Sequence, residues 1–514
     1  MSTVTHTITL QGIEPQLITC EMDVTPGYGI HVTGMDDLSL KECLLRSVTA
    51  LQACGYAVPG RRLEITLRPS ELRKVGPRYD LAIASLLVSA SRPFGDSRPL
   101  DTSRLERFIL VGELALDGGL RAVNGALQAV KAFREGDFQG VILPEANLQE
   151  IADAFPGESL EGVYPVSTLH EAFKVINGDV EGLSVEDELE TSPCNDEPHS
   201  VSSYHRLPEG AQRVAEIAAA GGHHLLVVGA AFRTEPLART VRELLPPLGR
   251  DDALTNALLY STLGPDSHPI RGERPFRMPH YGSSLRALFG GGSGSDTLAP
   301  GEMSLANKGV LFIGDINLMP RSVKDAMRGP IEDKEIVLSR LRTRVRYPSD
   351  FLLVGSMEPC PCGRYGTGEE CRCTPAAREE YMAKTTGSPL FEHFGLHFWA
   401  DGQQRPNEQG DLNEAQARVS RARVLQAERY AGTAYKTNND VMSRDADTYF
   451  HIDEDCKTLL ENLILHMGLS ARCYSWILRI ARTIADLDGT EEILGKHLAE
   501  AASFQFINKV PSEQ

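Results

Sequence analysis

The chain has 514 residues, a length that predicts roughly three or four domains with sizeable hydrophobic cores. Hydrophobic residues make up 41% of it and charged residues 24%, which excludes collagen-like, coiled-coil and wholly disordered proteins. The formal net charge of −18 opposes strong non-specific nucleic-acid binding by the monomer as a whole, but it is compatible with a locally basic loop.

The sequence carries no pattern typical of membrane insertion or export. No stretch approaches the roughly 20 apolar residues that span a bilayer, and the N-terminus lacks a basic region followed by an apolar one. Ten cysteines are too few for a disulfide scaffold, and four of them crowd between positions 360 and 373. We therefore expect a soluble, cytoplasmic protein with reduced thiols and no membrane partner.

Residues 1–178 are predicted to form one compact α/β domain. Helix-like stretches lie at 40–53 and 79–90. Short apolar runs bounded by turn residues predict strands at 63–67, 108–111 and 141–143. Residues 179–203 follow, and their stretch to Pro198 is rich in Asp and Glu and has no aromatic residue. Such a segment cannot bury enough apolar surface to order itself, so it is predicted to be a linker.

Residues 204–400 are predicted to form a second α/β domain. Its clearest strands are at 225–228, 310–313 and 351–354, with helical stretches between them, as in a parallel sheet. A glycine-rich stretch at 290–300 predicts a flexible loop. Residues 401–514 are predicted to be mostly helical. There, apolar residues recur at spacings near three and four and predict one buried stripe: Leu469, Cys473, Trp476, Ile477, Ile480, Ile484 and Leu487.

The stretch 223–239 has the strand, turn and helix order of a phosphate-binding loop. Such a loop needs glycines, a lysine for the β- and γ-phosphates and a hydroxyl for magnesium. Counting that spacing from Gly229 places Thr234, Glu235 and Pro236 at the last three positions. Glu235 reverses the sign of an interaction of about 4 kcal/mol, and Pro236 removes a hydroxyl and a backbone donor. By itself, the stretch is more typical of an ordinary strand–turn–helix than of a phosphate-binding loop.

Several other motifs resemble the ComM/YifB family of Mg-chelatase-like AAA+ proteins. In the second domain and the helical region these are VLFIGD (310–315), PIEDKEI (330–336), PCPCG (359–363), CRCTP (371–375) and LSARCY…ILRIARTIADLDG (469–489). In the front domain, ITLQGIEPQLITCEMDVTPG, LRKVGPRYDLAIA and VGELALDGGLRAVNGALQAVKA resemble the Lon-type domain of that family. The resemblance covers nearly the whole chain apart from the acidic linker.

This resemblance implies a fold and an assembly. The expected fold is a Lon-protease-like α/β domain of the ribosomal protein S5 type, an AAA+ P-loop-type domain with a parallel sheet, and a C-terminal helical lid. The expected assembly is a homo- or hetero-oligomeric ring, a hexamer by resemblance. Members of the family are associated with branch migration of DNA in recombination and natural transformation, so DNA is an implied partner.

The chain departs from the family at most of the positions that handle nucleotide. The acidic pair Asp-Glu is represented by Gly314 and Asp315, and the Asn that contacts the γ-phosphate by Glu358. His393 stands at the position of the likely trans-acting arginine of the family motif LLDRIDLH, and Arg472 alone matches the second sensor arginine. Phosphoryl transfer is mostly positioning and charge stabilisation. The departures predict no hydrolysis and leave open whether ATP and Mg²⁺ still bind.

The front domain also departs from Lon-type peptidases. Arg78 lies at the position of their nucleophilic serine, and Leu127 at the position of their lysine base. Neither residue can perform the corresponding step. We therefore expect no peptidase activity, and a structural use of this domain.

Four cysteines form two close pairs that predict a zinc site: Cys360, Cys362, Cys371 and Cys373. Four thiolates can surround one zinc ion tetrahedrally as a structural site with no open position. Gly363, Gly366 and Gly368 supply turns that let the pairs converge. The one-residue spacing is tighter than the usual two to four, so four reduced thiols in a turn-rich loop stay an alternative.

A basic loop interleaved with aromatic residues precedes the glycine-rich stretch. Its members are Arg271, Arg274, Phe276, Arg277, His280, Tyr281 and Arg286. Arginines and aromatic faces are what proteins use to bind single strands, and the loop resembles the family's insert facing the central pore. An ordinary solvated loop is the alternative interpretation.

Three functions follow from these patterns. The first is a non-hydrolysing accessory or regulatory member of the family in DNA processing. The second is an active ATP-driven DNA motor that binds nucleotide unconventionally. The third is a scaffold that binds neither nucleotide nor DNA.

Overall fold

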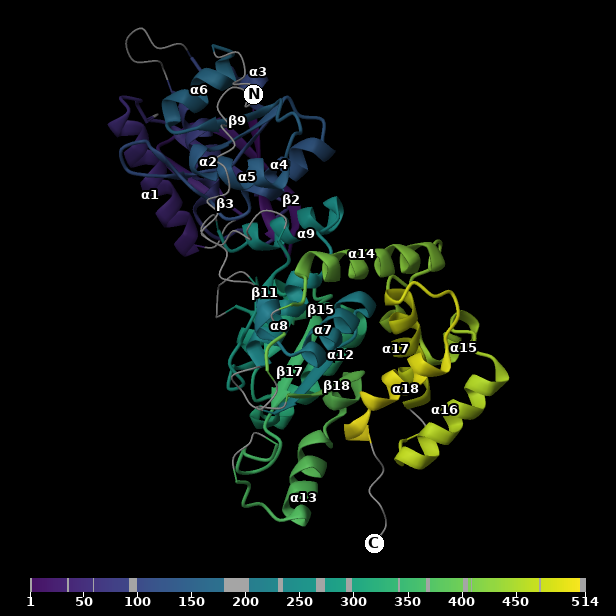
Figure 1. The fold of residues 1–514 in the computed structure, drawn as a ribbon. Coiled ribbons are helices and arrows are strands. Elements are labelled where there is room, and N and C mark those ends of the chain that lie inside the picture. Colours follow the sequence, from purple (N-terminus) through teal and green to yellow (C-terminus); the bar gives the residue numbers. More distant parts are fainter. Residues whose placement is uncertain are drawn as a thin grey trace.

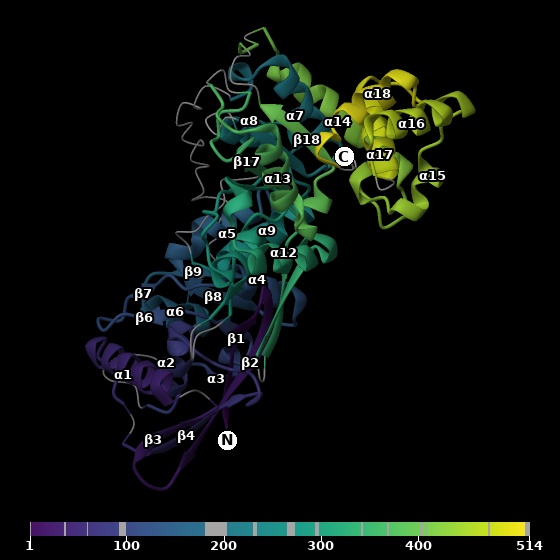
Figure 2. The same ribbon diagram turned by 90° about the horizontal axis from the view of Figure 1, so that it is seen from below.

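The computed structural model describes residues 2–34, 37–58, 60–91, 99–179, 203–229, 234–264, 273–292, 298–340, 343–366, 370–400, 405–407, 409–470 and 473–508. Figures 1 and 2 show a front α/β domain, a second α/β domain and a C-terminal helical region in that order along the molecule. Nearly all of the predicted acidic linker lies outside the described residues. The fold class predicted from the sequence is confirmed.

The front domain is built on a mixed sheet with the order β3-β4-β2-β1-β5-β8-β9. Its strands are β1 (Thr3–Gln11), β2 (Glu14–Thr25), β3 (Gly29–Thr33), β4 (Arg62–Arg68), β5 (Phe108–Leu110), β8 (Gly140–Pro144) and β9 (Val163–Val166). β1, β2 and β4 pair antiparallel, whereas β5, β8 and β9 continue from β1 in parallel. The predicted strands are β4, β5 and β8.

Helices cover both faces of this sheet. They are α1 (Asp37–Ala53), α2 (Asp80–Ser89), α3 (Thr102–Leu105), α4 (Ala126–Glu135), α5 (Leu148–Ala154) and α6 (Leu169–Asn177). In β5, Phe108 and Leu110 pack with α1, α2 and α6, whereas Ile109 packs with α4 and α5. Successive strand residues point to opposite faces, so a strand covered on both sides is apolar throughout.

The second domain holds a wholly parallel sheet with the order β11-β14-β17-β10-β18. Its strands are β11 (Phe276–Arg277), β14 (Val310–Ile313), β17 (Leu352–Met357), β10 (Leu225–Gly229) and β18 (Leu396–Ala400). The three predicted strands are thus found, with the third shifted toward Met357. Parallel order was expected from alternating strands and helices.

Helices also cover this second sheet on both faces. They are α7 (Glu209–Gly221), α8 (Thr234–Leu244), α9 (Arg250–Ser261), α10 (Leu285–Phe289), α11 (Glu302–Leu305), α12 (Arg321–Asp333) and α13 (Pro375–Thr386). Leu225 and Val227 of β10 face α7 and α8, and Leu226 and Val228 face α12. Thr374 caps α13 by accepting from the Ala377 N–H, next to a proline at the first helical position.

Two short hairpins extend the second domain. β15 (Glu335–Arg340) pairs with β16 (Thr343–Pro348), and β12 (Gly290–Gly291) with β13 (Ala299–Pro300). The stretch 290–300, predicted to be a flexible loop, therefore has paired ends. Its residues 293–297 lie outside the described part of the chain.

The helical region packs on the same apolar cluster as one face of the second sheet. Its helices are α14 (Leu412–Arg429), α15 (Ala446–Tyr449), α16 (Glu454–Met467), α17 (Cys473–Leu487) and α18 (Gly495–Ser503). The predicted apolar stripe is buried except at Trp476, which is partly exposed. Among the described residues, no helix combines the length and apolar character needed to cross a membrane.

Helix α9 joins the front domain to the second domain and contacts α4, α5 and α11 (Figure 1). The Gly125 N–H donates to the Ser261 carbonyl at 2.7 Å, and the Gln128 amide donates to the Leu258 carbonyl at 2.7 Å. Leu258 packs into the front-domain core. The front domain is therefore held by buried polar and apolar contacts as well as by the chain itself.

Candidate functional site

The candidate nucleotide site lies at the carboxyl edge of the second sheet. Strands β14, β17 and β10 are neighbours and parallel, so the segments that follow them meet at one edge. In open α/β sheets, ligands bind at this edge. Gly314 and Asp315 follow β14, Glu358 follows β17, and the loop after β10 leads into α8.

Gly229 is fixed as glycine by the approach of β18. Its φ is 144°, and a Cβ there would lie 2.3 Å from the carbonyl oxygen of Ala400. Residues 230–233 of the loop lie outside the described part of the chain. Thr234 begins α8 and is buried, and Pro236 lies in the first helical turn, where a missing N–H is tolerated.

Glu235 occupies the position that a phosphate-binding lysine would need. It forms an (i, i+4) ion pair with Arg239, at 2.7 Å between Oε1 and Nη2. The Arg239 guanidinium also lies over the Phe276 ring, at 4.7 Å from its centroid. The start of α8 therefore carries a carboxylate paired within its own helix.

Gly314 and Asp315 form the turn after β14. Asp315 has a left-handed conformation with φ of 50°, which Asp tolerates better than most residues, and its N–H donates to the Ser356 hydroxyl at 3.3 Å. A Cβ at Gly314 would meet its nearest atoms, in Phe312 and Ser356, only at 3.9 Å. A side chain that carries a carboxylate could therefore begin at position 314 without a steric clash at its Cβ.

Glu358 is exposed and faces the carboxylate of Asp315. Partial burial, and then the charge of Asp315, raise the pKa of Glu358 above its usual value. Among the described residues, no Lys or Arg forms an ion pair with Asp315 or Glu358. The described part of this edge therefore presents two carboxylates whose charges repel one another.

The structure does not bring His393 to this edge. His393 ends a short helical turn (Pro389–His393), and its Nε2 lies 3.6 Å from Oε1 of Glu332. Burial lowers the pKa of His393, so its ring is neutral at pH 7 and cannot replace an arginine charge. Together with His224, it lines a cavity at the amino edge of the sheet. Arg472 lies outside the described residues.

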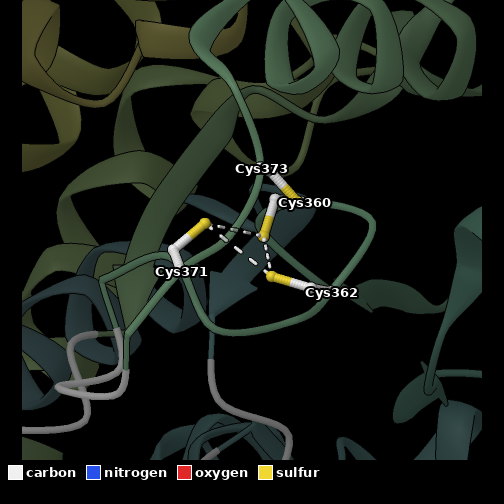
Figure 3. Close-up of side chains that lie close together, drawn as sticks. All are labelled: Cys360, Cys362, Cys371 and Cys373. Carbon is white, nitrogen blue, oxygen red and sulfur yellow. Dashed lines mark hydrogen bonds between the residues drawn. The ribbon is translucent and has the colours of Figure 1, made fainter.

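The four clustered cysteines converge in the segment between β17 and α13 (Figure 3). Their sulfurs all lie within 4.8 Å of one another. The Sγ–Sγ distances are 3.5 Å for Cys360–Cys362, 3.8 Å for Cys360–Cys371 and 3.7 Å for Cys362–Cys371. These lengths exclude disulfides, in which the sulfurs are about 2.05 Å apart.

The sulfur geometry fits a zinc ion. A tetrahedral site with Zn–S bonds of about 2.3 Å places sulfurs roughly 3.8 Å apart. Backbone hydrogen bonds from Arg364 and Arg372 lower the pKa of Cys362 to about 6, so that sulfur is a thiolate at neutral pH. Gly363 and Gly366 have φ of 73° and 74°, which confirms the predicted turns there, whereas Gly368 lies outside the described residues. Four sulfurs leave no open position, so a zinc ion here would be structural.

The basic loop divides into two parts. Arg274 donates to the carbonyls of Pro246 and Lys308, each at 2.5 Å, and burial lowers its pKa. Arg277 forms a bidentate pair with Glu302 at 2.7 and 2.8 Å.

Phe276 belongs to β11 and stacks on Phe312, with ring centroids 6.4 Å apart. These inner contacts leave the outer part of the loop to face solvent: exposed His280, whose ring lies 4.1 Å from that of Tyr281, and exposed Arg286. Arg271 lies outside the described residues.

The front domain uses the two peptidase-like positions for packing. Leu127 is buried, and its N–H donates to the Ser261 hydroxyl at 3.4 Å across the boundary with α9. Arg78 lies in a helical turn (Pro77–Tyr79), and burial lowers the pKa of its guanidinium. Neither environment provides a nucleophile or a base.

Family models match three parts of the chain. A model described as magnesium chelatase, subunit ChlI, matches residues 206–407. Subunit ChlI of Mg-chelatase matches residues 20–147, and the ChlI C-terminal model matches residues 411–505. The matches follow the front domain, the second domain and the helical region.

Individual relatives extend the similarity over the whole chain. The uncharacterized protein YifB of Salmonella typhimurium is 33% identical over 99% of this chain and 97% of its own length. The competence protein ComM of Haemophilus influenzae is 32% identical over 96% and 95% of the two chains. The magnesium-chelatase 38 kDa subunit of Cereibacter sphaeroides is 26% identical over 42% of this chain and 59% of its own.

Proposed function

The chain belongs to the magnesium-chelatase ChlI-like family, in the group that contains YifB and ComM, and from this premise we propose that it is a non-hydrolysing accessory or regulatory member. The observation that carries the proposal is the carboxyl edge of the second sheet. The charge of Asp315 acts there on Glu358, neither forms an ion pair with a described Lys or Arg, and the motif spacing aligns Glu235 with the phosphate-binding lysine.

The proposal follows from what phosphoryl transfer requires. The reaction needs a lysine and a metal ion on the phosphates and a positive group for the charge that develops in the transition state. Here Glu235, Gly314 and Glu358 replace three of those groups, and His393 is neutral. Losing one group reduces the rate, whereas losing all of them leaves no part of the mechanism.

The intact fold suggests what such a member does. We propose that it enters a ring, with copies of itself or with an active family member, and serves DNA processing as the competence relative suggests by its name. The exposed His280 and Arg286 of the basic loop, with the partly buried Tyr281 beside His280, are the proposed contact with single-stranded DNA. A zinc ion on the four cysteines would stiffen the segment that follows Glu358.

ATP turnover tests the loss of hydrolysis. Purified protein with ATP and magnesium should release phosphate no faster than buffer. Release that Asp315→Asn and Glu358→Gln both leave unchanged would be a contaminant. Magnesium-dependent release that follows the protein through further purification and changes in these variants would contradict the proposal and favour the motor.

Binding of a fluorescent single-stranded oligonucleotide tests the DNA contact. Arg286→Gln should weaken binding, and the change should shrink at high salt because phosphate contacts release counterions. The exposed Arg321, on the distant helix α12, gives the matched control Arg321→Gln. An oligonucleotide that does not bind the wild type, or binds all variants equally, would favour the scaffold.

A further inference from the structure

A cavity of about 640 Å³ lies at the amino edge of the second sheet, between that edge and the helical region. His224, directly before β10, and Leu352, the first residue of β17, line it from the sheet. Arg423 of α14 and Arg479 of α17 line it from the helical region. Strand β10 separates this cavity from the carboxyl edge by its five residues, or roughly 16 Å.

The carboxylates of the cavity are already paired with lysines. Lys308 lies 2.8 Å from Asp350 and 3.4 Å from Asp252. Lys334 lies 3.2 Å from Asp350 and 2.6 Å from Asp440. Three acidic side chains thereby share two lysines, so this group carries one more negative charge than positive charge.

The remaining acid of the cavity also has a partner. Glu332 forms an ion pair with Arg328, at 2.8 Å between Oε1 and Nε. Arg328 belongs to helix α12 and does not line the cavity. None of these carboxylates forms an ion pair with Arg423 or Arg479, although the charge of Asp440 acts on both arginines.

Two arginines of the helical region line the cavity and form no ion pair with a carboxylate among the described residues. Arg423 donates from Nε and Nη2 to one acceptor, the Ala219 carbonyl, at 3.1 and 2.7 Å. Arg479 is only 7% exposed; its Nη2 donates to the Ser443 hydroxyl at 3.2 Å, and its Nε has no hydrogen-bond partner. Burial lowers the pKa of both arginines to about 10, so both are charged at neutral pH.

A second buried arginine of α17, Arg482, does have a carboxylate partner. Arg482 lies one turn after Arg479 on α17, and its Nε lies 3.0 Å from the buried carboxylate of Asp486. Asp486 also pairs with Arg429 at 2.5 Å. Arg479 has the same burial but no such partner. Arginine keeps its proton when buried, so Arg479 is a charged group with free hydrogen-bonding capacity at Nε and only the charge of Asp440, beyond ion-pair distance, to offset its own.

We propose that this cavity binds a small phosphate-bearing molecule, with its phosphate between Arg423 and Arg479. Planar guanidinium groups match phosphate oxygens with paired hydrogen bonds. The cavity volume lies within the roughly 300–1,000 Å³ typical of small-molecule sites. Trp476, whose ring lies 4.7 Å from the Arg479 guanidinium, offers a surface for the rest of the molecule.

The site is independent of the proposed loss of hydrolysis, because it lies at the other edge of the sheet. Its walls come from both the second sheet and the helical region. A bound anion would therefore hold these two parts of the chain together. Lys436, which is exposed and also lines the cavity, would add a flexible cation at its mouth.

Tryptophan fluorescence can report binding in the full-length protein. The chain has two tryptophans, and Trp399→Phe leaves Trp476 of the cavity as the only one. Inorganic phosphate and pyrophosphate are titrated at constant ionic strength, with chloride as the matched salt. We expect a saturable change in fluorescence for at least one of these probes. No saturation by ~10 mM of either probe would overturn the proposal, since paired charge-assisted hydrogen bonds should bind more tightly.

Variants assign the signal to the cavity. Arg479→Gln should weaken binding at least about tenfold, since it removes a charge-assisted contact. Arg421→Gln changes an exposed arginine of α14 outside the cavity and should leave binding unchanged. If Arg479→Gln does not fold, Lys436→Gln decides, because that exposed residue tolerates replacement. Equal affinity in the wild type and the folded cavity variants would overturn the proposal.

The source of the phosphate is resolved by two further titrations. An adenosine nucleotide that saturates more tightly than pyrophosphate, and competes with it, would identify a nucleotide as the occupant. A single-stranded oligonucleotide that changes Trp476 fluorescence while phosphate, pyrophosphate and the nucleotide do not would overturn the small-molecule assignment.

Discussion

The two edges of the second sheet differ in charge although they belong to the same five strands. At the carboxyl edge, the charge of Asp315 acts on Glu358, and neither forms an ion pair with a described Lys or Arg. At the amino edge, Arg423 and Arg479 line a cavity without forming an ion pair with its carboxylates. A parallel sheet fixes where its loops converge, but the side chains decide which charge that edge accepts. In this chain, the surplus of positive charge lies at the end of the sheet opposite to the usual ligand edge.

The cysteine cluster sharpens this contrast because it begins only two residues after Glu358. Its four sulfurs lie within 4.8 Å of one another and fit a zinc site, whereas at the neighbouring edge Asp315 and Glu358 form no ion pair with a Lys or Arg of the described residues. The predicted departures from the family motifs thus concern groups that handle phosphate. The neighbouring segment, in contrast, supplies all four cysteines that a zinc site needs. The core around both is buried and continuous.

The largest expected effect is the recovery of turnover at the carboxyl edge. Thr234→Gly, Glu235→Lys and Pro236→Thr together should restore nucleotide binding without hydrolysis. Adding Gly314→Asp and Asp315→Glu supplies the metal carboxylate, and position 314 has room for it. His393→Arg should then raise turnover further, by on the order of 10³-fold if the group acts between subunits. Calorimetry measures binding, and phosphate release measures turnover.

The same loop replacement also tests whether charge alone explains the predicted loss of nucleotide binding at the carboxyl edge. A folded loop variant that binds no nucleotide would mean that the pocket itself has changed shape, and not only its charge. The front domain gives a control: Arg78→Ser alone should restore neither nucleotide binding nor peptidase activity, because its partner position is Leu127.

The metal centre should show the next largest effect. Elemental analysis should find about one zinc per chain, and Cys371→Ser should lower that content and cost on the order of 4 kcal/mol of stability. Cys54→Ser, a partly exposed cysteine of the front domain, is the matched control and should keep the metal. Stoichiometric zinc that survives replacement of every clustered cysteine would place the metal elsewhere.

The front domain holds a buried acid, Glu150. Unlike a buried arginine, a buried acid can become neutral by a shift of its pKa. Burial raises the pKa of Glu150 to about 7, beside the amide of Asn147. The folded state then holds the proton more tightly than the unfolded state, whose pKa is near 4.5. The contribution of Glu150 to stability is therefore fully present below about pH 4.5 and is lost as pH rises to about 7, by roughly 3 kcal/mol in all.

Glu150→Gln should remove that pH dependence. The amide keeps the volume and can still accept from Asn147, and it cannot ionise. Chemical denaturation between pH 5 and pH 8 measures the change, with the exposed Glu135→Gln as the control. A wild-type stability that does not fall over this range would show that Glu150 ionises freely.

The smallest expected effect concerns Glu235. Its pair with Arg239 joins two side chains that are 41% and 44% exposed, so Glu235→Gln should cost only about 0.4 kcal/mol. Denaturation of this variant beside Glu379→Gln, an exposed residue of α13, measures the difference. A loss of several kcal/mol would mean that the acidic edge stabilises the fold, and the charge contrast would then have a structural origin.

The sequence by itself predicted the features that depend on neighbouring residues. β10, β14, α1 and α2 follow from local apolar patterns, and the cysteine pairs lie close together along the chain. The predicted replacements at the nucleotide positions also rest on the fixed spacing of the motif, and they stay a prediction. The family resemblance, also carried by local motifs, is confirmed by relatives that cover nearly the whole chain.

Only the tertiary structure decided which distant residues meet. It pairs Arg277 with Glu302 and directs Arg274 to backbone carbonyls, so the inner half of the basic loop packs within the domain. It also places Arg423 and Arg479 around one cavity, although 56 positions separate them in the sequence. Local patterns determine helices and strands, but a buried charge is satisfied by whatever group the packed chain brings within hydrogen-bond distance, and spacing along the sequence does not contain that information.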